Sequence, residues 1–360
     1  MVNGSDLHKL IDEIDEIADQ GARIPLVEDA IRLADQLQER YFSFSLRMDL
    51  IHHAVFNGQA MKSLPAFAWC LADLERPDCE FELDDILWEY KWINSGSADF
   101  SEISMQKIEE LDLDFKQKLQ ECGYNENCYH YVRMNRGIAI HDKALAEASF
   151  IEMGKYPRDI MSDCRACVQD GLVEFMLFMG RYQEAKKLAE PIFQGKLSCA
   201  EVPHYTYGKM LLPTYFAGEL EEAAAIEKKA YRLLYKNEEF LGLIGDFLLY
   251  YAFTAPKKAL ERYPKFATWP YNPYTTGLRK RSFHASVAAM FAQLIKIGKE
   301  DTSFQLAKGH PLYDTSGVYS LKALQDYHYA AAAEIGDKFD ARNGNSGYAN
   351  ELAETMARVS

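Results

Sequence analysis

The feature that most constrains the fold is a segment that repeats itself after 38 residues. Residues 180–189 (GRYQEAKKLA) match residues 218–227 (GELEEAAAIE): a glycine comes first, a large apolar residue two positions later and an alanine five positions later. Glycine ends a helix without a Cβ penalty, and alanine lets two helices approach closely. The pattern therefore predicts two consecutive helix–turn–helix units.

Weaker copies of this pattern occur before residue 180, toward the N-terminus. One further copy follows the Gly218 segment on its C-terminal side. The intervals between successive markers are 36–43 residues, and apolar residues between them recur at spacings of three and four. Alternating strand patterns are nearly absent, so the sequence predicts an all-α fold of about seven units over residues 5–267. An irregular all-α domain with coincidental spacing is the alternative. The weaker markers are Gly21, Gly58, Gly96, Gly137 and Thr254.

These residues resemble the tetratricopeptide-repeat family, whose units of 34 residues are somewhat shorter. The resemblance is good around Gly180 and Gly218 and degenerate elsewhere. It implies a TPR-like solenoid, a right-handed α-α superhelix of antiparallel helix pairs whose concave face binds peptides or protein segments. The segments 162–167 (SDCRAC) and 199–207 (CAEVPHYTY) are also similar to those of uncharacterised bacterial tetratricopeptide proteins, a likeness that implies no activity.

The sequence divides into an array, a connecting loop and a cap. Residues 1–267 form the predicted array, and residues 268–280 contain two prolines and several aromatic residues, which is typical of a packed loop. Helical spacing resumes in residues 281–360. We interpret that segment as a C-terminal helical cap, because a solenoid must cover the exposed core face of its last unit.

Charge and composition exclude several classes of protein. The 54 acidic residues outnumber the 40 basic ones and give a net charge of −14, so the chain is not expected to bind nucleic acid. The N-terminus does not read as a signal peptide. The most apolar stretch, residues 240–253, is shorter than the ~20 residues of a membrane span. An odd number of cysteines, seven, indicates reduced thiols and a bacterial-type cytoplasm.

Four residues in two clusters suggest a metal site. Cys164 and Cys167 form a C-x2-C pair, and Cys199 and His204 follow as C-x4-H. In a stack of hairpins, the first helices of neighbouring units lie side by side, so both pairs are expected at one seam. A Cys3His set suits a structural Zn²⁺ ion. Packing cysteines and a redox-active C-x2-C pair are the alternatives.

Aromatic and basic residues suggest where a partner would bind. We predict that Tyr205, Tyr207 and Tyr215, with Lys209 as a charged contact, form a recognition surface on one first helix. Packing between helices is the alternative use of the same residues. A basic strip on successive second helices would suit an acidic peptide, unless its residues are ordinary solvated side chains. The strip comprises Lys186, Lys187, Lys228, Lys229 and Arg232.

Function is constrained mainly by what the sequence lacks. It has no P-loop, no G-x-S-x-G, no G-x-G-x-x-G, no H-E-x-x-H and no EF-hand loop. We therefore predict a non-catalytic scaffold or adaptor that binds a protein or peptide, of which a peptide-gated regulator is a subtype. The alternatives are a hydrolase or transferase on a helical-repeat scaffold, or a structural assembly protein. The sequence identifies neither the partner nor the oligomeric state.

Overall fold

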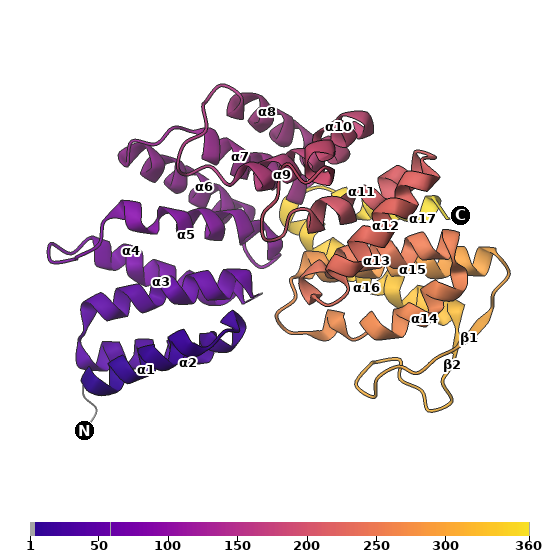
Figure 1. Cartoon of the computed structure of the whole chain (residues 1–360), viewed down its shortest axis with the longest axis horizontal. Helices are drawn as coiled ribbons and strands as arrows, with labels where there is room; N and C mark the ends of the chain where they lie inside the picture. Colours follow the sequence, from indigo (N-terminus) through magenta and orange to yellow (C-terminus); the bar gives the residue numbers. More distant parts are fainter. Residues whose placement is uncertain (1–3, 58, 360) are drawn as a thin grey trace. The chain divides into compact units, whose positions relative to one another are not determined.

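The computed structural model describes residues 4–57 and 59–359, and most of this part of the chain is helical (Figure 1). It contains seventeen α-helices, four short 3-10 turns and one pair of three-residue strands. The all-α prediction is confirmed. Within the described ranges, no helix combines the length and apolar character that crossing a membrane requires.

The chain forms two compact units whose sequences interleave. Unit 1 comprises the described residues up to Ser97, with Gln106–Val132 and Met153–Met161. Unit 2 comprises Ala98–Met105, Arg133–Glu152 and residues 162 onward. Each unit is therefore built from segments that are distant in the sequence.

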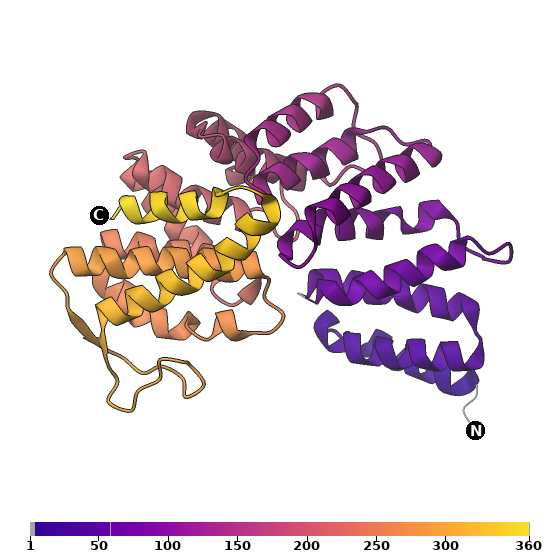
Figure 2. The ribbon, with the colours of Figure 1, turned by 180° about the vertical axis from the view of Figure 1, so that it is seen from behind.

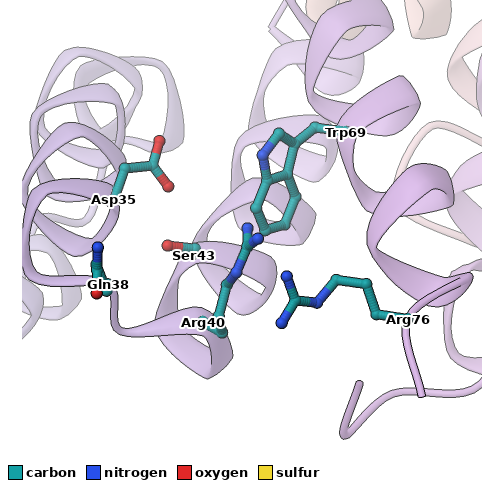
Figure 3. Close-up of a pocket in the computed structure, with 6 residues that line it drawn as sticks. All are labelled: Asp35, Gln38, Arg40, Ser43, Trp69 and Arg76. Carbon is teal, nitrogen blue, oxygen red and sulfur yellow. The ribbon is translucent and has the colours of Figure 1, made fainter. Parts of the chain in front are cut away.

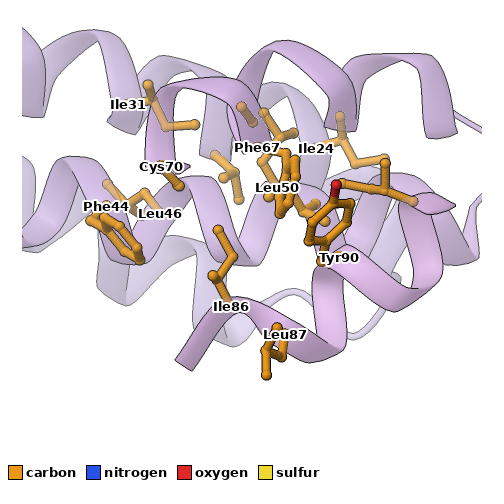
Figure 4. Packing of buried hydrophobic residues seen from close by; sticks show 14 of the residues in the cluster. Ile24, Ile31, Phe44, Leu46, Leu50, Phe67, Cys70, Ile86, Leu87 and Tyr90 are labelled. Carbon is orange, nitrogen blue, oxygen red and sulfur yellow. The ribbon is translucent and has the colours of Figure 1, made fainter. Parts of the chain in front are cut away.

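Unit 1 contains the first six α-helices and the start of the seventh. Their bounds are α1 Gly4–Glu16, α2 Gln20–Leu37, α3 Arg40–Phe56, α4 Ser63–Leu74, α5 Leu83–Gly96, α6 Met105–Glu121 and α7 Asn127–Ala139, with the 3-10 turns η1 Ala60–Lys62 between α3 and α4 and η2 Ser97–Asp99 after α5. Helix pairs α1/α2 and α3/α4 pack against each other, and α2 packs on α3. Figure 4 shows side chains of α2 to α5, including Ile24, Phe44, Phe67 and Tyr90, meeting in one apolar core. Local capping sets the helix starts: Asp19 Oδ1 accepts the backbone N–H of Gly21 at 2.8 Å.

Unit 2 contains the remaining helices and the strands. Their bounds are α8 Lys143–Met153, α9 Arg165–Phe178, α10 Tyr182–Phe193, α11 His204–Phe216, α12 Leu220–Leu234, η3 Glu238–Phe240, α13 Leu241–Thr254, α14 Pro256–Phe266, η4 Trp269–Tyr271, α15 Gly277–Lys296, β1 Asp301–Ser303, β2 Val318–Ser320, α16 Leu321–Asn343 and α17 Gly347–Ala357. Consecutive helices pack as the pairs α9/α10, α11/α12 and α13/α14. The first helices of these pairs also contact one another, α9 with α11 and α11 with α13, and α15 continues the row by packing on α13.

The two strongest repeat markers lie at hairpin turns, as predicted. Gly180 and Gly218 have φ angles of 75° and 83°, the left-handed region that favours glycine after a helix. The large residue two positions after each glycine begins the second helix of the pair. Ala185 and Ala223, five positions after each glycine, are fully buried. The described chain has fourteen α-helices from Gly4 to Phe266, and their division into seven hairpins stays a prediction.

The weaker glycine markers have other positions. Gly21 lies in the first turn of α2, Gly96 ends α5, and Gly137 lies inside α7. A Cβ atom at Gly137 would come within 2.5 Å of the backbone nitrogen of Ala146 in α8. Glycine is needed there for close helix approach rather than for a turn. Gly58 lies outside the described residues.

The region after α14 is more ordered and more varied than its sequence pattern predicts. The predicted loop contains η4, and α15 begins inside it at Gly277. The antiparallel pair β1/β2 interrupts the helical cap, with Thr302 opposite Tyr319. Helix α16 continues to Asn343, and Gly344 then ends it at φ 69°. Figure 2 shows α17 beside α15 and α16, both of which it contacts.

Unit 2 is held together by contacts between its distant segments. The Arg342 guanidinium donates to the carbonyl oxygens of Phe100 and Ala98 at 2.9 and 3.0 Å, across 242 and 244 residues of sequence. The Tyr348 hydroxyl donates to the Ala139 carbonyl at 2.5 Å, and the Asn345 side chain donates to Ile140 at 2.7 Å. The two bonds from Arg342 flank Asp99 and anchor the short segment that carries it.

Candidate functional site

A cavity of about 460 Å³ in unit 2 is the strongest candidate for a binding site. Its wall comes from α9, α11, α13 and α15, the row of helices described above, with contributions from η2 and η3. This is the arrangement in which successive first helices share one face. The lining residues are Asp99, Asp170, Glu174, Tyr205, Lys209, Glu239, Phe240, Gly242, Leu243, Asp246, Thr276, Leu278, Arg279 and Ser282.

Two of the four predicted recognition residues line this cavity. Tyr205 and Lys209 are four residues apart on α11 and so share one face of the helix. The Lys209 ammonium lies 5.4 Å from the centre of the Tyr205 ring, and the same ring packs edge-on against Phe240 at 4.9 Å. Burial raises the pKa of Tyr205, so its hydroxyl stays neutral.

Both cations of the cavity wall already have carboxylate partners. Lys209 Nζ lies 2.7 Å from Asp170 Oδ2 and also pairs with Glu174. Burial disfavours the charge on Lys209, but these two carboxylates outweigh it and raise the pKa of the ammonium. Arg279 donates to Glu239 at 2.9 Å. The cavity therefore presents no unopposed positive charge.

Two further carboxyl groups of the cavity, those of Asp99 and Asp246, form no ion pair with a described residue. Within the described residues, neither Asp99 nor Asp246 has a basic nitrogen at ion-pair distance. Burial raises the pKa of Asp99, although the more distant charges of Arg279, Arg136 and Arg342 oppose it. Burial raises the pKa of Asp246 to about 7, and a 2.6 Å hydrogen bond from the Ser286 hydroxyl only partly offsets the effect. The wall carries five carboxylates and two cations, so it is acidic.

The other two predicted recognition residues lie outside the cavity wall. Tyr207 is 7 % exposed and stacks on Phe193, with ring centres 4.5 Å apart, so it packs between helices. Tyr215 packs against Tyr250 and Phe253. The alternative of inter-helix packing describes both residues better than a binding surface does.

The predicted basic strip is partly neutralised. Lys186 lies 2.6 and 2.5 Å from the carboxylates of Glu219 and Glu222. Lys229 lies near the Tyr207 ring, 5.7 Å from its centre. Lys186 is therefore neutralised by carboxylates, and the use of this strip by an acidic peptide stays a prediction.

Three of the four predicted metal ligands come together. The sulfur atoms of Cys164, Cys167 and Cys199 all lie within 4.8 Å of one another, and they could hold a metal ion. Cys164 caps the start of α9, where its Sγ accepts the Cys167 backbone N–H at 3.3 Å. Burial opposes ionisation of Cys164, but hydrogen bonds from Cys167 and Cys199 outweigh it and lower its pKa. In the described part of the chain, no cysteine forms a disulfide.

His204 is not part of this group. It begins α11, and its ring stacks on Phe240 with the planes 6° apart. Its Nδ1 atom is buried and has no hydrogen-bond partner among the described residues, and burial lowers the pKa of the ring. The predicted Cys3His set is therefore reduced to three thiols in this structure.

Unit 1 has a second cavity, of about 610 Å³, between the ends of α2 and α4 (Figure 3). Arg40 lies over the Trp69 ring, 5.3 Å from its centre, and Arg76 points toward the same space. These cations are paired, Arg40 with Asp73 at 3.4 Å and Arg76 with Asp78 at 2.7 Å. None of these residues belongs to the predicted sites.

Sequence reasoning missed the unpaired carboxylates. Asp246 could have been found, because it is the one charged residue in the most apolar stretch of the chain, residues 240–253. Burying a carboxylate there without a reason would be unfavourable. Asp99 gives no comparable signal, since it reaches the cavity through the long-range contacts of Arg342.

Comparison with known proteins adds no assignment. No protein-family model matches the chain, and no curated protein is significantly similar to it.

Proposed function

We propose that unit 2 belongs to a TPR-like right-handed superhelix and binds a peptide or protein segment in the groove formed by α9, α11, α13 and α15. The observation that carries this proposal is that four helices in one row line a single cavity containing Tyr205 and Lys209. In a stack of helix pairs, that row is the inner face, where an extended segment can contact several units at once. Tyrosine suits such a surface because it offers a large rigid contact and a polar tip.

The charge of the wall favours a segment that carries a basic side chain. Among the described residues, neither Asp99 nor Asp246 has a basic nitrogen at ion-pair distance, and their buried positions make an incoming ammonium or guanidinium group a favourable counter-ion. A lysine or arginine side chain fits within about 460 Å³. An acidic segment would bring further negative charge to the two carboxyl groups that lack a cation at ion-pair distance.

A displayed peptide library provides the test. The full chain should select peptides enriched in Lys or Arg, and chemical synthesis of the best peptide allows affinity to be measured by fluorescence titration. Asp99→Asn should weaken binding at least tenfold, because it removes one charge without changing the shape of the side chain. Acetylating the selected lysine should have a similar effect.

Tyr215→Phe is the matched control. Like Tyr205, Tyr215 lies on α11, but it is outside the cavity wall, so its variant should bind the peptide as the natural chain does. Tyr205→Ala should reduce binding while the circular-dichroism spectrum stays unchanged. Selected peptides without basic residues, or equal binding by all variants, would contradict the proposed groove.

A second candidate is an enzyme that uses Asp246 as a general acid or base. The specific observation is that burial raises the pKa of Asp246 to about 7, the range in which a carboxyl group can both accept and donate a proton near neutral pH. A screen of hydrolase and transferase substrates with the natural chain and Asp246→Asn would test it. Turnover that persists in the variant would exclude this role.

A further inference from the structure

The three clustered thiols come from two separate segments of unit 2. Cys164 and Cys167 lie at the start of α9, with their sulfur atoms 3.3 Å apart. Cys199 comes from the connection between α10 and α11, and its sulfur lies within 4.8 Å of both. A contact between the two segments is therefore made by sulfur atoms.

The spacing of the sulfur atoms matches the requirement of a metal ion. Zinc–sulfur bonds of about 2.3 Å in a tetrahedron place the sulfur atoms about 3.8 Å apart. The sulfur atoms of Cys164 and Cys167 are 3.3 Å apart, below this value, and both lie no more than 4.8 Å from the sulfur of Cys199. Shifts of less than about 1 Å would complete the geometry.

The connection that carries Cys199 is held in place by its own contacts. The Cys199 backbone N–H donates to the Val202 carbonyl at 2.9 Å, which closes a turn. Val202 is 2 % exposed and packs with Ala166 and Ile192, next to Cys167. Ligation of a metal therefore requires little ordering of the chain, and the entropy lost on binding is small.

Exposure distinguishes this cluster from packing cysteines. Cys164 and Cys199 are exposed, whereas Cys70 and Cys128 are buried as packing residues usually are. An ion bound by the three sulfur atoms would be reachable from solvent. Among the described residues, no histidine, carboxylate or fourth thiol lies close enough to all three sulfur atoms to join the set.

We propose that Cys164, Cys167 and Cys199 bind one Zn²⁺ ion as thiolates, and that the fourth coordination position is filled by an exchangeable ligand from solvent. The ion would join the start of α9 to the connection before α11. Because α9 and α11 both line the cavity, zinc would stiffen one wall of it. The inference does not depend on what the cavity binds.

Titration of the reduced, tag-free chain with Co²⁺, a spectroscopic substitute for zinc, tests the proposal. One equivalent should produce a thiolate-to-cobalt charge-transfer band in the near ultraviolet, and Zn²⁺ should displace the cobalt and remove the band. Cys199→Ser should weaken binding by more than the ~10–100-fold that losing an outer-shell partner costs. The control Cys79→Ser changes a cysteine of unit 1 and should leave the titration unchanged.

The variant His204→Gln distinguishes a metal site with three protein ligands from a site with four. We expect this variant to bind cobalt as the natural chain does, and added imidazole to shift the cobalt bands by entering the open position. A loss of affinity equal to that of Cys199→Ser would overturn the three-thiolate site in favour of a closed Cys3His site. Absence of the band, or a Cys164–Cys167 disulfide that persists after anaerobic reduction, would overturn the metal site altogether.

Discussion

Asp246 shows how a single side chain can connect stability with binding. Its pKa in the folded chain, about 7, exceeds the ordinary value of 3.8, so the folded state holds the proton more tightly than the unfolded state. Its contribution to stability is therefore present at low pH and is lost as the pH rises from about 4 to about 7. Such an unfavourable group is typical of a site retained for function.

Replacing Asp246 with asparagine should stabilise the chain above neutral pH. Asparagine carries no charge and still offers an oxygen to the Ser286 hydroxyl. At pH 8 we expect Asp246→Asn to raise the free energy of unfolding by up to about 4 kcal/mol, and at pH 4 to have little effect. Urea denaturation at both pH values measures this. A variant less stable than the natural chain at pH 8 would contradict the assignment.

The buried histidines of unit 2 should make the fold sensitive to acid. The Nδ1 atoms of His284 and His328 lie 2.7 Å apart, and His328 also bonds to the Tyr263 hydroxyl at 2.9 Å. Burial, reinforced by the charges of His310 and Lys280, lowers the pKa of His284 to about 4. The folded pKa lies below the unfolded value of 6.5, so stability is present above that value and is lost as the pH falls toward 4.

Between pH 7 and pH 5 this one group should remove about 2 kcal/mol of stability. His284→Gln should lower stability at pH 7 yet reduce its dependence on pH by about that amount. His8→Gln, at an exposed position on α1, should keep the natural pH dependence. Chemical denaturation at a series of pH values compares the three chains, and parallel curves for His284→Gln and the natural chain would count against the mechanism.

At the scale of helices, some glycines are required for close approach rather than for a turn. Gly137 faces the Ala146 backbone in α8, which cannot rotate away as a side chain could. Gly137→Ala should therefore destabilise the chain by about 1–3 kcal/mol or more, because the two helices must separate. Gly96→Ala is the control: nothing lies within 4 Å of its Cβ position, so it should be neutral or mildly stabilising. Thermal denaturation of both variants tests this prediction. Equal melting temperatures would contradict close packing of α7 against α8 at Gly137.

Some features of the helices and turns were predictable from the sequence and others were not. The turns at Gly180 and Gly218 were predictable because a glycine after a helix and a buried alanine within the next one are local signals. The strands β1 and β2 were not, since three residues are too few for an alternating pattern. The residues of α11 that face the cavity were predictable only in part. Tyr205 and Lys209 share one face of the helix because they are four residues apart. The position of Tyr207 could not be predicted, because it depends on packing against Phe193 of another helix. The sequence correctly predicted that Cys199 lies beside Cys164 and Cys167. It did not predict that His204 stacks on Phe240 and lies outside the cysteine cluster.

At the scale of the whole molecule, the interleaved units limit where the chain can be cut. Residues 98–105 and 133–152 belong to unit 2, where Arg342 and Tyr348 bond to them. A fragment of residues 98–360 should therefore melt cooperatively at a higher temperature than a fragment of residues 162–360. Circular-dichroism melts of the two fragments provide the measurement. Equal melting temperatures would mean that these long-range bonds contribute nothing to unit 2.

The bonds from Arg342 also set an order of events during synthesis. Its partners at Ala98 and Phe100 leave the ribosome 242 or more residues earlier. At about 5–20 residues per second, the early segment waits roughly 10–50 s for the guanidinium that will fix it. Until then these two bonds cannot hold the segment that carries Asp99, so we expect the proposed binding site to be among the last parts of the molecule to form on a nascent chain.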